Sequence, residues 1–213
     1  MPSRFWPRFA VAAYALLWVV LAIGPADRPT WILENVLVAA LWLALAALYR
    51  WFRLSDGSLA MILAFLALHA LGSHYTYSEV PYDAWIQTLT GRGLDARMGW
   101  DRNQFDRLVH FAYGLLFVVP VREFLLRVIR APGFWSYFLP LNIILGTSAL
   151  YELIEWGAAI WFGGDLGMHY LGTQGDVWDA HKDMALAGAG GLLAMLCCAL
   201  ADSAGRRSSR MGR

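Results

Sequence analysis

The most constraining feature of this chain is a series of apolar segments, each close to the thickness of a bilayer in helical length. The hydrocarbon core of a membrane is about 30 Å across, and a helix needs roughly 20 mostly apolar residues to span it. Because an isolated sheet cannot satisfy its backbone hydrogen bonds in lipid, such segments favour helices. We therefore predict an all-α, polytopic integral membrane bundle of about six transmembrane helices. The predicted spans are 9–23, 31–52, 58–74, 105–126, 134–162 and 182–202.

The composition excludes several other classes of protein. The chain is 59% hydrophobic and 15% charged, with a formal net charge of +1, whereas a soluble domain is about 45–50% apolar and about 25% charged. A disordered chain, a strongly basic nucleic-acid binder and an ordinary soluble enzyme are all inconsistent with these values. The two cysteines, Cys197 and Cys198, are adjacent and form neither a disulfide framework nor a CxxC metal motif. We expect one membrane domain over 1–213 and no nucleic-acid partner.

Basic residues predict the orientation of the spans. With the N-terminus inside, the inner segments carry more Arg and Lys than the outer ones, which favours both termini in the cytoplasm. The tail 203–213 is basic and is expected to lie near anionic lipid. The first span also resembles a signal peptide, but it ends at Gly24 and Pro25, a poor cleavage site, so a retained helix is favoured. Two long connecting segments, 75–104 and 163–181, then lie on the outer side, where long loops are often functional.

Ionisable residues inside spans are costly and indicate a function or a paired partner. Here they recur at three- and four-residue spacing, which places the members of a group on one helix face. Under the predicted topology, all the groups lie near the outer ends of spans, so separate segments converge at one depth. The candidate catalytic residues are Asp106, His110, Glu152, Glu155, Asp176, Asp179 and Asp183.

A second set of polar residues lies on the same predicted side and forms the candidate ligand-binding group. Its members are His74, Tyr77, Glu79, Arg102, Arg107 and Gln174. Several carboxylates cannot all ionise side by side in a low-dielectric site, so some must be protonated, bound to metal or paired, for example with Arg102 or Arg107. The alternative is a polar network that only joins helices, in which Asp179 caps the last helix and Asp183 interacts with its dipole.

A divalent metal is a further alternative for this cluster. A mixed nitrogen and oxygen donor set suits Zn, Mn or Fe, and the candidate ligands are His110, Glu152, Glu155 and Asp183. The spacing matches neither His-Glu-x-x-His nor the Glu-x-x-His pair of di-iron bundles. The small residues Gly188, Gly190 and Gly191 are instead typical of close helix packing.

Four ordered motifs resemble the YjdF family of bacterial inner-membrane proteins. They are His-Tyr-Thr-Tyr-Ser-Glu-Val-Pro at 74–81, Arg-Asn-Gln-Phe-Asp-Arg-Leu-Val-His-Phe at 102–111, Tyr-Glu-Leu-Ile-Glu-Trp at 151–156 and Gly-Thr-Gln-Gly-Asp-Val-Trp-Asp at 172–179. The resemblance implies a multi-pass protein of the bacterial inner (plasma) membrane, and it does not imply an activity.

A more distant similarity is to VanZ-like membrane proteins. The order of Asp106, His110, the Glu152–Glu155 pair and Asp183 before a glycine-rich last span fits their pattern. Arg107 stands where those proteins have Lys, and Trp156 stands where Gln is usual. This similarity implies a helix bundle whose polar residues face one interior site.

Three functional hypotheses follow. The first is an outward-facing acidic and histidine site that binds or modifies an envelope lipid or a lipid-linked glycan. The second is a small transporter or an ion or proton pathway, since buried carboxylates can relay protons. The third is a structural or assembly protein in which the polar cluster only joins helices. Whether the protein is an enzyme, and its oligomeric state, are left open by the sequence.

Overall fold

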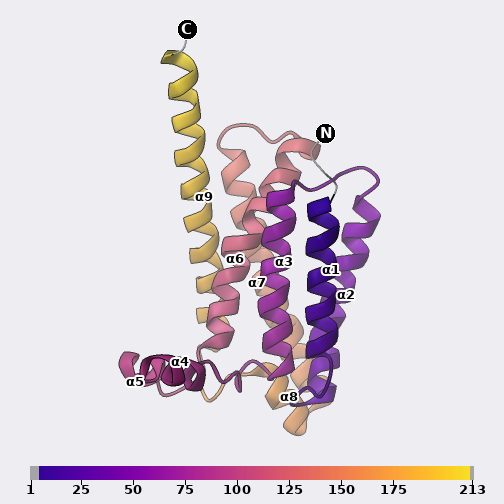
Figure 1. Ribbon diagram of the computed structural model, residues 1–213, viewed down its shortest axis with the longest axis vertical. Coiled ribbons are helices and arrows are strands. Elements are labelled where there is room, and N and C mark those ends of the chain that lie inside the picture. The colour runs from indigo at the N-terminus through magenta and orange to yellow at the C-terminus, as the bar shows by residue number, and fades with distance from the viewer. Residues whose placement is uncertain (1–4, 212–213) are drawn as a thin grey trace.

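The protein is a bundle of long helices with its short helices gathered at one end (Figure 1). The computed structural model describes residues 5–211, and side chains within 6–205 except those at positions 165 and 169. Within this described part the chain is helical and contains no strand. The long helices are α1 (Phe5–Leu21), α2 (Arg28–Leu48), α3 (Asp56–His74), α6 (Phe105–Phe124), α7 (Trp135–Phe162) and α9 (Asp179–Met211).

Both connecting segments that the sequence analysis treated as loops contain short helices. The first holds α4 (Tyr82–Thr90) and α5 (Leu94–Met98), and the second holds α8 (Gly164–Leu171). All three lie at the end of the bundle away from the two chain termini (Figure 1). A single π-helical turn, η1 (Leu125–Ile129), follows α6 at the opposite end. The polar end of the bundle is therefore built from ordered elements.

Helix starts follow local capping chemistry more closely than hydropathy. The α2 helix begins three residues before the predicted span because the Asp27 side chain accepts a hydrogen bond from the Thr30 amide at 2.8 Å. The α3 helix begins after Ser55, whose hydroxyl accepts from the Ser58 amide at 3.2 Å. The last helix begins at Asp179 and continues to Met211, well beyond the predicted span. Its backbone therefore includes most of the predicted basic tail, 203–213. The side chains of this tail from residue 206 onward, and all of residues 212–213, lie outside the described part.

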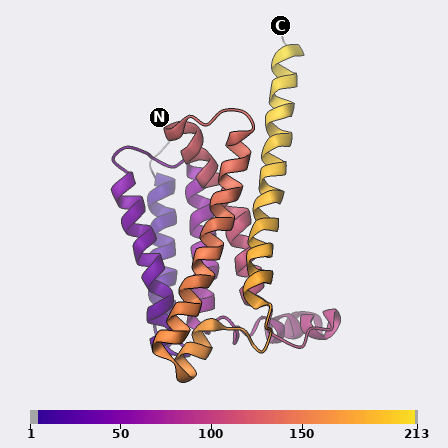
Figure 2. The same cartoon turned by 180° about the vertical axis from the view of Figure 1, so that it is seen from behind.

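Four of the long helices are long and apolar enough to cross a membrane, namely α2, α3, α7 and α9. The α1 helix is apolar but shorter. The α6 helix has charged residues at both ends, with Asp106 and Arg107 near one and Arg122 and Glu123 near the other. The long helices lie side by side in both views, and α9 extends beyond its neighbours (Figures 1 and 2).

Glycines bring α6 and α9 into close contact. A Cβ atom on Gly190 would meet the backbone of Phe111, and one on Gly114 would meet the backbone of Ala187. Small residues allow this approach because their backbones can come together without side chains between them. The prediction that the glycines of the last span serve helix packing is thus confirmed. The close packing fixes the polar first turns of α6 and α9 against each other.

Candidate functional site

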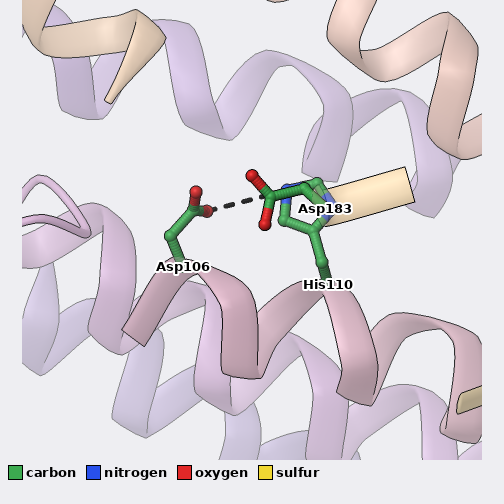
Figure 3. A group of neighbouring side chains, drawn as sticks. All are labelled: Asp106, His110 and Asp183. Atoms are coloured by element: carbon green, nitrogen blue, oxygen red, sulfur yellow. Dashed lines mark ion pairs between the residues drawn. The ribbon is translucent and has the colours of Figure 1, made fainter. Parts of the chain in front are cut away.

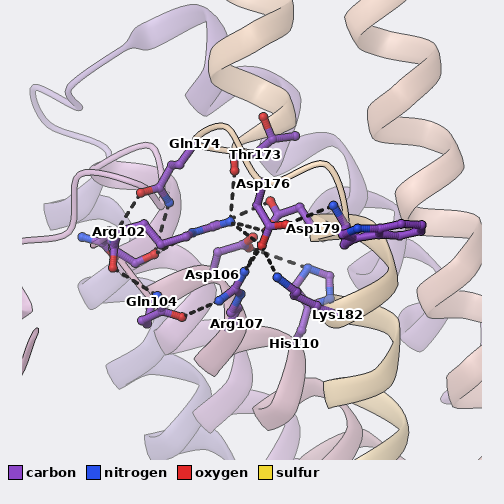
Figure 4. Close-up of polar contacts among 12 residues, drawn as sticks. Arg102, Gln104, Asp106, Arg107, His110, Thr173, Gln174, Asp176, Asp179 and Lys182 are labelled. Atoms are coloured by element: carbon purple, nitrogen blue, oxygen red, sulfur yellow. Dashed lines mark hydrogen bonds and ion pairs between the residues drawn. The ribbon is translucent and has the colours of Figure 1, made fainter. Parts of the chain in front are cut away.

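A layer of ion pairs joins the segment before α6 to the start of α9 (Figure 4). The Arg102 guanidinium donates to the Asp179 carboxylate through both terminal nitrogens and to the Thr173 carbonyl at 3.0 Å. The Arg102 and Asp179 side chains are 12% and 5% exposed. Because both charged groups are largely buried, their pairing is needed to compensate for lost hydration.

Asp176 is the centre of a second set of contacts in this layer. Its Oδ2 atom accepts hydrogen bonds from Arg107 Nη2 and from Lys182 Nζ, both at 2.5 Å. Its Oδ1 atom accepts from the Trp178 amide at 3.0 Å. The hydrogen bond from Lys182, supported by the Trp178 amide, lowers the pKa of Asp176 to about 2. Asp176 is thus an ionised anchor for the turn that precedes α9.

Gln174 anchors the same turn to the segment before α6. Its side-chain oxygen accepts from the Asn103 amide at 3.0 Å, and its side-chain nitrogen donates to the Asn103 carbonyl at 3.2 Å. The Gln174 backbone has a φ of 47°, in the left-handed region that non-glycine residues rarely adopt. Asn103 also donates to the Val80 carbonyl at 2.8 Å. The sequence analysis did not single out Asn103, although it lies within one of the four quoted motifs.

The α4–α5 segment is attached to the start of α6 through Tyr82. The Tyr82 hydroxyl donates to Asp95 Oδ1 at 2.7 Å and accepts from the Gln104 amide at 2.9 Å. Burial, together with the hydrogen bond donated to Asp95, raises the pKa of Tyr82 to about 12. The phenol therefore stays protonated at neutral pH and keeps its role as a donor.

Deeper in the bundle lies a trio of ionisable side chains, Asp106, His110 and Asp183 (Figure 3). His110 and Asp183 are buried, and Asp106 is half-buried. One donor atom from each of them lies within 4.8 Å of the donor atoms of the other two. The distance from His110 Nε2 to Asp106 Oδ1 is 3.6 Å. Asp183 is 2% exposed, and its Oδ1 atom has no hydrogen-bond partner among the described residues.

The two glutamates of α7 differ in their surroundings. Glu152 lies beside the trio, with its Oε1 atom 3.7 Å from His110 Nε2 and without a hydrogen-bond partner in the described part of the chain. Glu155 is buried but does not belong to the group of close donor atoms. The predicted metal ligands His110 and Asp183 thus lie together, joined by Asp106, which was not among them. Of the two predicted glutamate ligands, Glu152 lies at the edge of this group and Glu155 lies outside it.

A further buried acid comes from α2. Glu34 is 4% exposed, and its Oε2 atom accepts a hydrogen bond from the Tyr151 hydroxyl at 3.2 Å. The sequence analysis did not include Glu34 or Tyr151 among the site residues. Glu34 could have been identified as a lone carboxylate in an otherwise apolar segment. Tyr151 could have been identified by its position directly before Glu152 and close to Glu155.

A cavity of about 310 Å³ lies between α2, α3, α6 and α7. One part of its wall is polar and includes Asp106, His110, His69, Tyr77 and Tyr151. The other part is apolar and includes Leu37, Leu41, Phe65, Leu66 and Phe117. Two wall residues, Leu150 and Ile154, are 55% and 38% exposed. The wall of the cavity therefore reaches the surface of the bundle at α7, and the lining changes from apolar to polar along the cavity.

Tyr77 reaches the cavity through an unusual backbone. Thr76 and Tyr77 have φ angles of 56° and 53°, a left-handed conformation that costs energy and clusters at functional sites. The Tyr77 hydroxyl lies 2.5 Å from His69 Nδ1. Its ring occupies the space beside Gly72, where a Cβ atom would approach the ring to 2.7 Å. Tyr77 is thus held in the cavity wall by contacts that depend on the end of α3.

Two residues of the predicted binding group lie apart from the cluster. His74 Nδ1 is 2.7 Å from the Leu21 carbonyl oxygen, so this side chain joins α3 to the end of α1. Glu79 is exposed. Both lie near the polar end of the bundle, but neither faces the cavity or the ion-pair layer. Tyr77 lies in the cavity wall. The remaining predicted residues fall in the ion-pair layer, in the trio or beside it.

These features define a helical membrane protein with a buried acid and histidine cluster beside an amphipathic cavity. The chain belongs to the family described as "Predicted membrane protein (DUF2238)", whose model matches residues 6–203. It is similar to "Inner membrane protein YjdF" of Escherichia coli (strain K12), with 33% identity over 182 residues, covering 85% of this chain and 83% of that protein. No solved structure matches. The predicted YjdF-type family and inner-membrane location are confirmed, and the similarity to VanZ-like proteins stays a prediction.

Proposed function

We propose that this protein binds an amphipathic lipid of the bacterial envelope, with the polar headgroup at the buried acid and histidine cluster and an apolar chain in the cavity. The observation that carries the proposal is the cavity itself, which is apolar at one end and polar at the other. Its volume of about 310 Å³ lies at the lower limit of small-molecule sites, which range over about 300–1,000 Å³. A cavity wall that reaches the surface of the bundle at α7 supports entry from the bilayer.

The proposal includes a topology of six spans with both termini in the cytoplasm. In it, α1 and α6 cross the bilayer together with the four longer apolar helices. Support comes from the positive-inside bias and from two connecting segments at the end of the bundle opposite α4, α5 and α8 (Figure 1). The α2–α3 connection carries Arg50 and Arg53, and the segment after η1 begins with Arg130. The headgroup site then faces the outer side of the inner membrane.

The chemistry of the cluster favours a headgroup that donates hydrogen bonds. Carboxylates accept from hydroxyl and amine donors. The cluster supplies two buried carboxyl groups, on Asp183 and Glu155, and two half-buried ones, on Asp106 and Glu152. The nearby cations Arg102, Arg107 and Lys182 are already engaged by Asp176 and Asp179. A sugar hydroxyl of a lipid-linked glycan or the amine of a phospholipid headgroup therefore fits this surface. The neighbouring Asp106 and His110 side chains form an acid and base pair that could move a proton on such a group.

Lipid analysis of the purified protein tests this proposal. We expect mass spectrometry of protein extracted in mild detergent to find one lipid class enriched over the bulk membrane. Asp106→Asn should reduce this enrichment at least tenfold, whereas Asp101→Asn, an exposed carboxylate of the same region, should leave it unchanged. Leu41→Trp should reduce it by filling the apolar part of the cavity. Equal lipid content in all four proteins, with no class enriched, would contradict lipid binding.

Reconstitution into proteoliposomes separates this proposal from the alternatives. A small transporter or a proton pathway predicts substrate- or pH-driven flux across the vesicle membrane. An assembly protein predicts that loss of the buried charges lowers stability alone and that a partner protein copurifies. Lipid binding without flux supports the proposed function.

A further inference from the structure

The trio formed by Asp106, His110 and Asp183 has the composition and spacing of a metal site. Two residues come from adjacent turns of α6 and the third from near the start of α9, so the site depends on the glycine-mediated contact between these helices. The donor atoms lie within 4.8 Å of one another. An ion about 2.0–2.2 Å from each ligand would hold these atoms roughly 3–4 Å apart, so binding requires the three side chains to draw slightly closer together.

An unsatisfied buried atom provides independent evidence for a ligand at this point. Asp183 is 2% exposed, and its Oδ1 atom has no hydrogen-bond partner among the described residues. A buried carboxylate oxygen without a partner is costly, because it has lost its hydration and gained nothing in return. The side chain is directed toward Asp106 and His110 (Figure 3), so a cation between the three residues would satisfy it.

The balance of charges around the trio also favours a bound cation. The cationic side chains at this level, Arg102, Arg107 and Lys182, bind Asp179 and Asp176 in the layer above the trio. Neither Asp106 nor Asp183 forms an ion pair with these three cations in the described part of the chain. His110 Nε2 lies 3.6 Å from Asp106, and Glu152 adds another carboxyl group 3.7 Å from the imidazole. A divalent cation would compensate the excess of carboxylates in this low-dielectric interior.

We propose that Asp106, His110 and Asp183 bind one divalent transition-metal ion, of the Zn²⁺, Mn²⁺ or Fe²⁺ class. The imidazole ligand favours these ions over Ca²⁺ and Mg²⁺, which prefer oxygen ligands alone. Three protein ligands leave at least one coordination position open, as in metal sites that bind substrate or water. Asp106 and His110 also line the cavity, so the open position is available to a bound molecule.

The role of the metal, though not its binding, rests on the proposed function. An ion at the polar end of the cavity would allow a phosphate-containing headgroup to approach the carboxylates, which otherwise repel it. The chemical class of ligand then extends from hydroxyl and amine donors to the phosphate of a phospholipid or of a lipid-linked sugar.

Elemental analysis of the full-length protein in mild detergent tests the site. We expect about one equivalent of Zn, Mn or Fe per chain in the wild type and in Asp101→Asn, and at least a tenfold lower content in Asp183→Asn and in His110→Gln. The second variant keeps the test valid if the first fails to fold. Wild-type protein treated with a chelator should regain thermal stability on addition of ZnCl₂, MnCl₂ or FeSO₄, and the two variants should not.

Two results would overturn the metal site. One is wild-type protein that contains no stoichiometric metal and shows no change in unfolding temperature with any of the three salts. The other is equal metal content in the wild type and in a folded trio variant. Lipid analysis of the same samples keeps this proposal apart from lipid binding: enriched lipid without metal refutes the site alone, and metal without enriched lipid refutes lipid binding alone.

Discussion

Replacing Arg102 with glutamine is expected to destabilise the bundle through the Asp179 carboxylate that it leaves behind. Arg102 donates through both terminal nitrogens to Asp179 and also to the Thr173 carbonyl. Glutamine is too short to reach both partners and carries no charge. Asp179, whose side chain is 5% exposed, would then be a buried carboxylate without its principal counter-ion.

The expected magnitude follows from this burial. Removing one partner of a buried ion pair costs about 3–5 kcal/mol. Arg107 Nη2 remains 3.5 Å from Asp179 Oδ1 and compensates part of the charge, so we expect the free energy of unfolding to fall by about 2–3 kcal/mol. For a chain of this size, each kcal/mol corresponds to about 2–4 °C in unfolding temperature. The variant should therefore unfold about 4–12 °C below the wild type.

Thermal unfolding in detergent, followed by the fluorescence of the 11 tryptophans, measures this shift. Arg92→Gln is the matched control, because Arg92 is an exposed arginine of the same connecting segment and such changes cost under about 0.5 kcal/mol. Adding Asp179→Asn to Arg102→Gln should recover part of the loss by removing the orphaned charge. If Arg102→Gln unfolds at the same temperature as Arg92→Gln, or if the double variant is less stable by the sum of both single effects, the reasoning is refuted.

Two further changes test other parts of the bundle. Gly190→Ala places a methyl group against the α6 backbone and should lower the free energy of unfolding by about 1–3 kcal/mol. Gly146→Ala, at a helical glycine with open space around it, is the control and should leave the unfolding temperature unchanged. Equal unfolding temperatures for the two variants would contradict the packing argument. Asp176 has a pKa of about 2 in place of the ordinary 3.8, so its stabilisation is present above pH 3.8 and is lost as the pH falls through about 2. The unfolding temperature should therefore decline more steeply below pH 3.8 in the wild type than in Asp176→Asn, and parallel declines would contradict this assignment.

The sequence by itself determined the properties that depend on neighbouring residues. Apolar segments of bilayer length specify helices, since the backbone must be satisfied within each segment. Residues four apart share a helix face, so the pairing of Asp106 with His110 could be predicted. The gathering of the polar residues at one end of the bundle also followed, because each group lies near the same end of its predicted span.

The tertiary structure alone decided which polar groups meet. Asp183 joins Asp106 and His110 because glycines on α6 and α9 allow these two helices to approach closely. Glu155 lies outside that trio, and Glu34 enters the buried polar region from α2 through Tyr151. Helix contacts of this kind depend on crossing geometry and rotation between segments far apart in the chain. Span length and local spacing carry no information on either quantity, and so the composition of the site was visible only in the folded bundle.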